Sequence, residues 1–239
     1  MISIIIPTLN EEGVISRTIR KLKEGLGAVP HEIIVSDGGS KDKTARIAEG
    51  LGVKVFVDPK PGTIAKGRNE GAKRAAGAYL VFLDADVFIP DPEGFFKRLI
   101  GVFESKSEVV AATVGIRVLR ELETRMDRLV FSSLNLFHLI SNNIFNFGRA
   151  AGEFQMIRSR VFKELGGYRE DLAASEDYDL FSRLSKVGRV LFVRGLTVYH
   201  TGRRAHKIGW PRLLLEWSRN AFMVTFFKRS HSKKWEVVR

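Results

Sequence analysis

The chain has 239 residues, of which 44% are hydrophobic, and this is enough for one large domain or two small ones. It contains no cysteine, which excludes disulfides and thiolate metal sites and fits a reducing compartment. The net charge is +12, and residues 203–239 alone hold ten Lys and Arg against two Glu, a net of +8. This basic segment suggests an anionic partner, such as phosphate groups, nucleic acid or an acidic membrane, unless it serves solubility alone.

The first hundred residues alternate strand and helix patterns. Four runs predict buried strands: 2–7, 31–36, 53–57 and 79–83. Helical patterns follow the first three strands: from about Glu11 with Asn10 as its cap, at 42–50 and at 65–76. Asp91-Pro92 predicts the start of another helix. Regular alternation of this kind predicts an α/β fold with a Rossmann-like, doubly wound, mostly parallel sheet.

The second half is less regular. Residues 109–119 predict one or two strands, 122–147 a long helix, 176–187 another helix, and 190–193 and 196–200 two strands. Residues 211–227 predict a final amphipathic helix. An apolar stripe on the long helix is expected to pack on a core; it consists of Val130, Leu134, Phe137, Ile140, Ile144 and Phe147.

No linker divides the chain, so we expect one catalytic domain over 1–202. Its nucleotide-binding half covers about 1–105 and its acceptor half about 106–202. Residues 203–239 form a basic, amphipathic extension that belongs to the same domain or faces a membrane.

Polar residues follow three of the predicted strands: Thr8, Asn10 and Glu11 after the first, Asp37 to Ser40 after the second, Asp84 and Asp86 after the fourth. The carboxyl ends of parallel strands share one edge of a sheet, so these clusters should meet. Residues i and i+2 of an extended chain face the same side, so Asp84 and Asp86 can hold a divalent ion that carries a diphosphate. The alternative is a turn with two solvated acids.

Four motifs occur in order: residues 7–12 (PTLNEE), 37–44 (DGGSKDKT), 83–86 (LDAD) and 175–177 (SED). Together they resemble the family 2 inverting glycosyltransferases of the GT-A fold, over about the first 200 residues. The resemblance implies metal-dependent transfer of a sugar from a UDP- or GDP-sugar, with inversion. Gly38 stands where the commoner motif has a second Asp, which leaves the choice between UDP and GDP open.

The resemblance also implies roles for single residues. Thr8 and Glu11 would contact the nucleoside, Asp37 the base, Lys66 or Arg68 the phosphates or ribose, and Glu153 and Gln155 the sugar hydroxyls. Arg203 would clamp the diphosphate or an anionic acceptor. The full predicted nucleotide-sugar site is Pro7, Thr8, Asn10, Glu11, Asp37, Gly39, Lys66, Arg68, Asp84, Ala85, Asp86, Glu153, Gln155, Glu176 and Arg203.

Asp177 matches the family's catalytic base, which takes the proton of the acceptor hydroxyl. Asp84, Asp86 and His200 are the implied ligands of Mg²⁺ or Mn²⁺, with Asp86 the direct ligand and the diphosphate completing the shell. From the residues alone, acids at a helix N-terminus and a histidine at a strand end also have ordinary structural explanations.

The helix at 211–227 combines Trp and Phe with basic neighbours, a composition typical of interfacial helices. The longest uncharged stretch, 129–148, is too polar to span a membrane, and no signal peptide precedes the first strand. We therefore expect a cytoplasmic enzyme at the inner face of the cell membrane, in peripheral contact with anionic lipid. Its acceptor would be lipid-linked, such as a polyprenyl phosphate. The alternative is that the aromatic residues pack on the catalytic domain.

Two other functions compete. A nucleotidyltransferase would need a glycine-rich, basic loop after the first strand, whereas residues 8–12 are acidic and glycine-poor. A nucleic-acid-binding protein is suggested by the pI of about 10.1, but the chain shows no Walker loop, zinc spacing or RNP-like strand. No nucleic-acid partner is expected.

Overall fold

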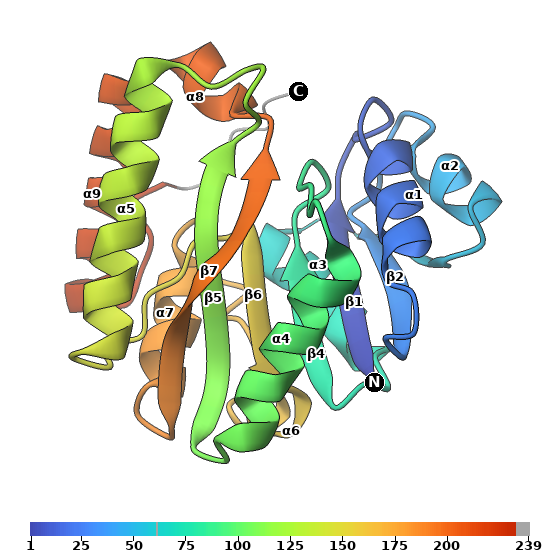
Figure 1. Cartoon of the computed structure of the whole chain (residues 1–239). Helices are drawn as coiled ribbons and strands as arrows, with labels where there is room; N and C mark the ends of the chain where they lie inside the picture. The colour runs from blue at the N-terminus through green and yellow to red at the C-terminus, as the bar shows by residue number, and fades with distance from the viewer. Residues whose placement is uncertain (61, 233–239) are drawn as a thin grey trace.

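The computed structural model describes residues 1–60 and 62–232, and in this part of the chain seven strands form one mixed sheet in the order β3-β2-β1-β4-β6-β5-β7 (Figure 1). The strands are β1 (Ile2–Thr8), β2 (His31–Asp37), β3 (Lys54–Val57), β4 (Tyr79–Leu83), β5 (Val109–Val118), β6 (Phe154–Arg158) and β7 (Arg189–His200). The helices are α1 (Ile15–Gly25), α2 (Thr44–Gly50), α3 (Ile64–Lys73), α4 (Pro92–Ser105), α5 (Arg125–Asn143), α6 (Ser159–Glu164), α7 (Glu176–Leu184), α8 (Arg203–Ile208) and α9 (Trp210–Phe227).

The sheet is parallel except for β6, which pairs antiparallel with both β4 and β5. The α/β fold with a mostly parallel sheet is thus confirmed, whereas β6 was not predicted as a strand. Residues 190–193 and 196–200, predicted as two strands, belong to the single strand β7, which pairs with β5 across a register shift between Val114 and Gly115. Because of this irregularity, the sequence pattern of the single strand β7 resembles that of two short strands.

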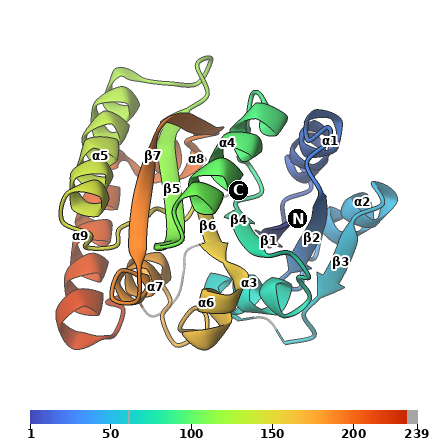
Figure 2. The same cartoon turned by 60° about the horizontal axis from the view of Figure 1, so that its bottom comes forward.

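Helices cover both faces of the sheet (Figure 1 and Figure 2). One apolar cluster joins the sheet to α1 and α4, and includes Ile19 and Phe96. The other joins it to α3, α6 and α7, and includes Phe162 and Leu180. Burial on both faces explains why β1 reads as a continuous apolar run.

The two predicted helix caps have different outcomes. Asp91 caps α4 as expected, accepting a hydrogen bond from Gly94 N at 3.1 Å. The prediction that Asn10 caps a helix from Glu11 was wrong, because α1 begins only at Ile15. Asn10 instead has φ of 56°, a left-handed conformation that asparagine tolerates, and it belongs to the loop that follows β1.

The expected packing of the apolar stripe on a core holds only for Val130 and Leu134, and was wrong for its other four residues. The helix buries Phe131, His138 and Asn142, whereas the stripe residues Phe137 and Ile140 are exposed. Phe131 packs edge-to-face on Trp210 of α9 and on the imidazole of His200, so the helix is anchored by one large ring among polar side chains. Most of the stripe is therefore available at the surface.

The C-terminal extension packs on the catalytic domain through one side of α9. Trp210, Leu213 and Val224 are buried, and Trp210 Nε1 donates to Asp127 Oδ1 of α5 at 2.8 Å. Phe222, Phe226 and Phe227 remain exposed. The last part of the predicted extension, 233–239, lies outside the described residues. Within residues 1–60 and 62–232, no helix combines the length and apolar character needed to cross a membrane.

Candidate active site

The loops after β1 and β2 are joined by hydrogen bonds. Thr8 Oγ1 donates to Asp37 Oδ2 at 2.9 Å, and Asn10 N donates to Ser40 Oγ at 2.7 Å. Asn10 Oδ1 accepts from Lys41 N at 2.8 Å, and Gly39 turns the second loop with φ of 87°. The expected meeting of these clusters at one sheet edge is confirmed.

Both carboxylate oxygens of Asp37 accept hydrogen bonds from residues of the loops after β1 and β2. Its Oδ1 accepts from the N–H groups of Gly39 and Ser40 at 3.0 and 2.7 Å, and its Oδ2 accepts from the hydroxyls of Thr8 and Ser40. The residue is 1% exposed. The expectation that Asp37 contacts the base does not fit this position, since its oxygens shape the loop that would face a nucleoside.

Arg68 is the centre of the charged cluster at the end of β4. It is 1% exposed, and it donates to Glu176 Oε1 at 2.6 Å, to Asp84 Oδ1 at 3.2 Å and to the Gly152 carbonyl at 3.0 Å. One guanidinium thus connects the Asp-x-Asp strand end with the Glu-Asp helix, which lie far apart in the sequence. Both terminal nitrogens of Arg68 are thus occupied by protein acceptors, which is the position of an organising residue.

The cluster holds more carboxylates than Arg68 can neutralise. Burial raises the pKa of Asp84 to about 7; Arg68 opposes this rise, while Glu153 and Asp86 add to it. Burial raises the pKa of Glu153 as well. An excess of crowded acids of this kind is relieved by a bound cation.

Asp177 is the second residue of α7, and the helix begins directly after Ser175, which has a left-handed conformation. Its Oδ1 accepts from Tyr178 N at 2.7 Å. Burial and the neighbouring Glu176 raise the pKa of Asp177 to about 8, and Arg68 lowers it. A Cβ built on Gly152 would lie 2.9 Å from Arg68 Nη2 and 3.8 Å from Asp177 Oδ2, so the glycine permits the close approach of loop and helix.

Arg203, at the start of α8, links the loop after β1 to the Asp-x-Asp turn after β4. It donates to both carboxylate oxygens of Glu11 at 2.7 Å, and its Nε lies 3.5 Å from Asp86 Oδ2. Thr201 Oγ1 donates to the same Asp86 oxygen. The structure therefore brings together Glu11, Asp86 and Arg203 from three distant segments, and it adds Thr201, which no sequence pattern had marked.

His200 ends β7 and is 8% exposed. Its Nδ1 accepts from Gly202 N at 3.3 Å, while its Nε2 is buried without a hydrogen-bond partner. Burial lowers its pKa, so the imidazole is neutral at pH 7. Among residues 1–60 and 62–232, no three His, Asp or Glu side chains lie close enough to hold a metal by themselves. The predicted set of Asp84, Asp86 and His200 is thus not assembled by the protein alone.

Four other residues of the predicted site do not face the charged cluster. Lys66 Nζ pairs with Asp58 Oδ2 at 2.7 Å, beyond the end of β3. Gln155 is fully buried; it accepts from the Tyr168 hydroxyl and donates to the Ala151 carbonyl at 3.1 Å, so an exposed contact with sugar hydroxyls does not fit. Pro7 lies near the end of β1 and Ala85 in the turn after β4, and both are buried.

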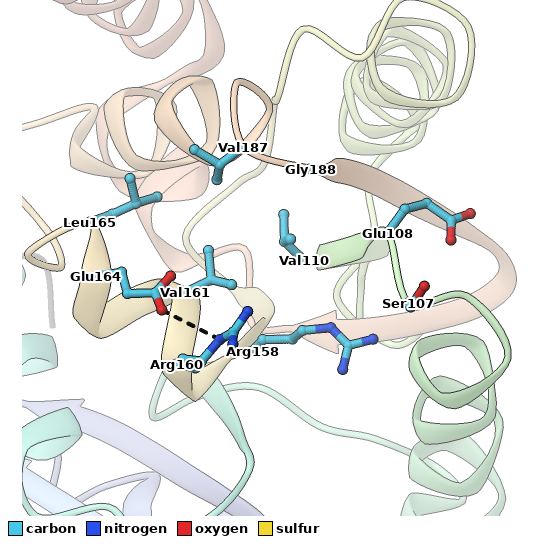
Figure 3. Close-up of a pocket in the computed structure, with 10 residues that line it drawn as sticks. All are labelled: Ser107, Glu108, Val110, Arg158, Arg160, Val161, Glu164, Leu165, Val187 and Gly188. Carbon is cyan, nitrogen blue, oxygen red and sulfur yellow. Dashed lines mark ion pairs between the residues drawn. The ribbon is translucent and has the colours of Figure 1, made fainter.

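A separate cavity of about 320 Å³ opens at the opposite edge of the sheet, where β5 and β7 begin and β6 ends (Figure 3). Its lining residues are Ser107, Glu108, Val110, Arg158, Arg160, Val161, Glu164, Leu165, Val187 and Gly188. None of the predicted site residues lines it, so it is not the site described here.

The family model described as glycosyl transferase family 2 matches residues 3–166, more than half of the chain. The chain belongs to this family. The resemblance found in the sequence is thus confirmed. The matched range contains Asp37, Asp84 and Asp86 but ends before Glu176.

Curated relatives are longer than this chain. The chain is 28% identical over 219 residues to the succinoglycan biosynthesis protein ExoA of Rhizobium meliloti (strain 1021), covering 87% of the chain and 65% of the relative. It is 36% identical over 110 residues to the glucosyl-3-phosphoglycerate synthase of Mycolicibacterium smegmatis (strain ATCC 700084 / mc(2)155), covering 42% of this chain and 35% of the relative. The chain thus spans about two thirds or less of these two proteins.

Solved structures share the fold. The mannosyltransferase PcManGT from Pyrobaculum calidifontis, in complex with GDP-Man and Mn²⁺, superposes with a TM-score of 0.72 at 17% identity, covering 95% of this chain and 63% of that one. The glucosyl-3-phosphoglycerate synthase from Mycobacterium tuberculosis, with Mn²⁺, UDP and glucosyl-3-phosphoglycerate, gives 0.64 at 20% identity, covering 95% and 79%. At these identities the likeness establishes the GT-A fold.

Proposed function

We propose that this glycosyltransferase moves a sugar from a UDP- or GDP-sugar to an acceptor in a single, inverting displacement. The observation that carries the proposal is the Arg68 bridge, which holds Asp84 at the end of β4 against Glu176 at the start of α7. This supports the proposal because the end of β4, which holds the proposed donor-side carboxylates, and the start of α7, which holds the proposed base, share one guanidinium. We assign residues 1–105 to the donor half, 106–202 to the acceptor half and 203–239 to an extension of the same domain.

Asp177 is the proposed base. As the acceptor oxygen attacks the anomeric carbon, its proton passes to the Asp177 carboxylate, and the bond from that carbon to the nucleoside diphosphate breaks. The electron pair leaves with the diphosphate. If the acceptor nucleophile is a phosphate oxygen that is already ionised, Asp177 orients it and no proton is transferred.

The residues present fit a divalent cation. Asp84 and Asp86 offer the hard oxygen ligands that Mg²⁺ and Mn²⁺ prefer, and the unpartnered Nε2 of the neutral His200 is a further donor. A bound cation would supply Lewis-acid stabilisation of the departing diphosphate. Arg203, now paired with Glu11 and Asp86, is placed to donate to the same diphosphate. The structures of PcManGT and of the glucosyl-3-phosphoglycerate synthase, which contain Mn²⁺, support this assignment.

The donor site can be tested by calorimetry with UDP- and GDP-sugars in Mn²⁺, Mg²⁺ or EDTA. We expect metal-dependent binding of one nucleotide class, lost in Asp86→Ala. Asp171→Asn, which changes a surface carboxylate with 63% side-chain exposure, is the control and should bind normally. Metal-dependent affinity retained in Asp86→Ala would contradict the ligand role, and absence of binding by the wild type would refute the proposed donor class.

We further propose that the acceptor is lipid-linked and that the enzyme contacts the inner face of an anionic membrane peripherally. Fourteen of the 17 exposed large apolar side chains of the described residues lie either in 122–147 or on α9. The helices α5 and α9 lie side by side at the β7 end of the sheet (Figure 1 and Figure 2). Apolar side chains gathered at one end of a basic protein are typical of interfacial binding.

Vesicle flotation tests this contact. Wild type should float with anionic phosphatidylglycerol vesicles at low salt and be released as salt rises, because each cation near the surface contributes about 1 kcal/mol. Phe222→Ser together with Phe226→Ser should weaken flotation, whereas Val187→Ser, which changes an exposed apolar residue outside α5 and α9, should not. Failure of the wild type to float under these conditions would remove the membrane contact.

A further inference from the structure

Arg149 is held in the segment between α5 and β6 by a clamp on its backbone. The fully buried Asn142 accepts from Arg149 N at 2.7 Å through Oδ1 and donates to the Arg149 carbonyl at 2.7 Å through Nδ2. A buried side chain that satisfies both main-chain groups of one residue fixes that residue's place. The position of the Arg149 side chain is thus determined by α5 rather than left to a mobile loop.

The guanidinium of Arg149 faces the first turn of α7. Its Cζ lies 5.2 Å from the ring centre of Tyr178, the residue that follows Asp177. Within residues 1–60 and 62–232, the Arg149 side chain makes hydrogen bonds through Nη1 alone, with the carbonyls of Phe147 at 3.1 Å and Gly148 at 2.9 Å. The guanidinium thus contacts two carbonyl oxygens and an aromatic face, but no carboxylate in the described part of the chain. Its Nε and Nη2 groups remain available as hydrogen-bond donors.

The surroundings of Arg149 do not compensate this charge. Burial lowers the pKa of Arg149. The nearby His138 on α5 is fully buried, and neither ring nitrogen has a hydrogen-bond partner. Burial and the charge of Arg149 lower the pKa of His138 to about 4, so it is neutral. A half-buried cation beside a neutral imidazole gains the most from an anion that arrives from outside.

The three cations that were predicted to contact the donor differ in this respect. Arg68 is paired with Asp84 and Glu176, and Arg203 with Glu11 and Asp86. Lys66 is paired with Asp58. Arg149, on the acceptor half, has no carboxylate partner among the described residues, so a negatively charged acceptor could bind it without breaking an ion pair.

We propose that Arg149 binds the anionic group of the acceptor, a phosphate ester or diphosphate, while the reacting atom of that acceptor lies at Asp177. This inference rests on the proposed function and deepens it by naming the chemical class of the acceptor. The stacked, exposed rings of Phe145 and Phe147, 5.3 Å apart, precede Arg149 in the chain and offer an apolar surface next to the charge. The same phosphate chemistry occurs in lipid phosphates and in soluble phosphate esters.

Calorimetry in the presence of Mn²⁺ and UDP tests the assignment with three probes: farnesyl phosphate, farnesol and inorganic phosphate. Wild type should bind farnesyl phosphate at least about tenfold more tightly than farnesol, because a charge-assisted hydrogen bond is lost with the phosphate. In Arg149→Gln this preference should disappear, and Arg149→Lys should keep part of it. Arg160→Gln is the control, since Arg160 pairs with Glu164 at the opposite edge and its side chain is 86% exposed.

The outcomes separate this inference from the proposed function. Equal affinity of Arg149→Gln and wild type for farnesyl phosphate would overturn the inference, as would equal affinity of wild type for farnesyl phosphate and farnesol. Binding of inorganic phosphate as tight as that of farnesyl phosphate, and lost in Arg149→Gln, would support it for a soluble ester. Tighter binding of farnesyl phosphate would support a lipid phosphate. Absence of metal-dependent binding of both UDP and GDP by the wild type would instead refute the donor assignment.

Discussion

Replacing Arg68 by Met should destabilise the fold, because it leaves two acids without the cation between them. Breaking a buried ion pair by removing one partner costs about 3–5 kcal/mol. The ion pair of Arg68 with Glu176 is buried, because the Glu176 side chain is 8% exposed. The pair with Asp84 is partly screened by water, because the Asp84 side chain is 31% exposed. We therefore expect a loss of about 3 kcal/mol in the free energy of unfolding, at the lower end of that range.

Urea unfolding followed by circular dichroism, in EDTA, measures this loss. The pKa of Asp84 is about 7 although Arg68 lowers it, so removing Arg68 raises it further. A carboxyl whose folded pKa exceeds the unfolded value destabilises the fold more as pH rises. The deficit of Arg68→Met should therefore be larger at pH 8 than at pH 5. A loss below about 1 kcal/mol, close to that of the exposed control Arg160→Met, would refute the reasoning.

Asp177→Asn should retain metal-dependent donor binding and lose about 10²–10⁴-fold in transfer rate to a hydroxyl acceptor; an active variant would remove Asp177 as the base. The pKa of Asp177 is raised to about 8, and a base works only when deprotonated, so kcat/KM for that acceptor should rise with pH towards about 8. A profile that is flat from about pH 6 to 9 would contradict this. Gly148→Ala should lower the free energy of unfolding by about 2 kcal/mol or more, since its φ is +66° and the new Cβ would lie 1.9 Å from the Phe181 carbonyl oxygen. Gly101→Ala, inside α4 with open space around it, should instead stabilise by about 0.5–1 kcal/mol in the same urea assay; equal effects of the two would show that the clash is relieved without cost.

The amino-acid sequence by itself determined the α/β class and the edge at which the site lies. Continuous apolar runs mark strands buried on both faces, and the parallel order of β1, β2 and β4 places their carboxyl ends together. Asp84 and Asp86 could be recognised because their spacing and their place after a strand are local properties. The same holds for Asp91, whose capping bond depends on residues three positions away.

Only the tertiary structure decided which distant groups meet. Arg68 reaches Glu176 across 108 positions, and Arg203 reaches Glu11 across 192, distances at which no local pattern carries information. The strand β6 was missed because its five residues include the polar Gln155, whose partner is Tyr168. The orientation of α5 was decided by Phe131, Asp127 and Asn142, which pack and hydrogen-bond inward, so that its apolar stripe lies largely outside. Periodicity identifies the faces of a helix, but which face is buried depends on the partners that the fold supplies.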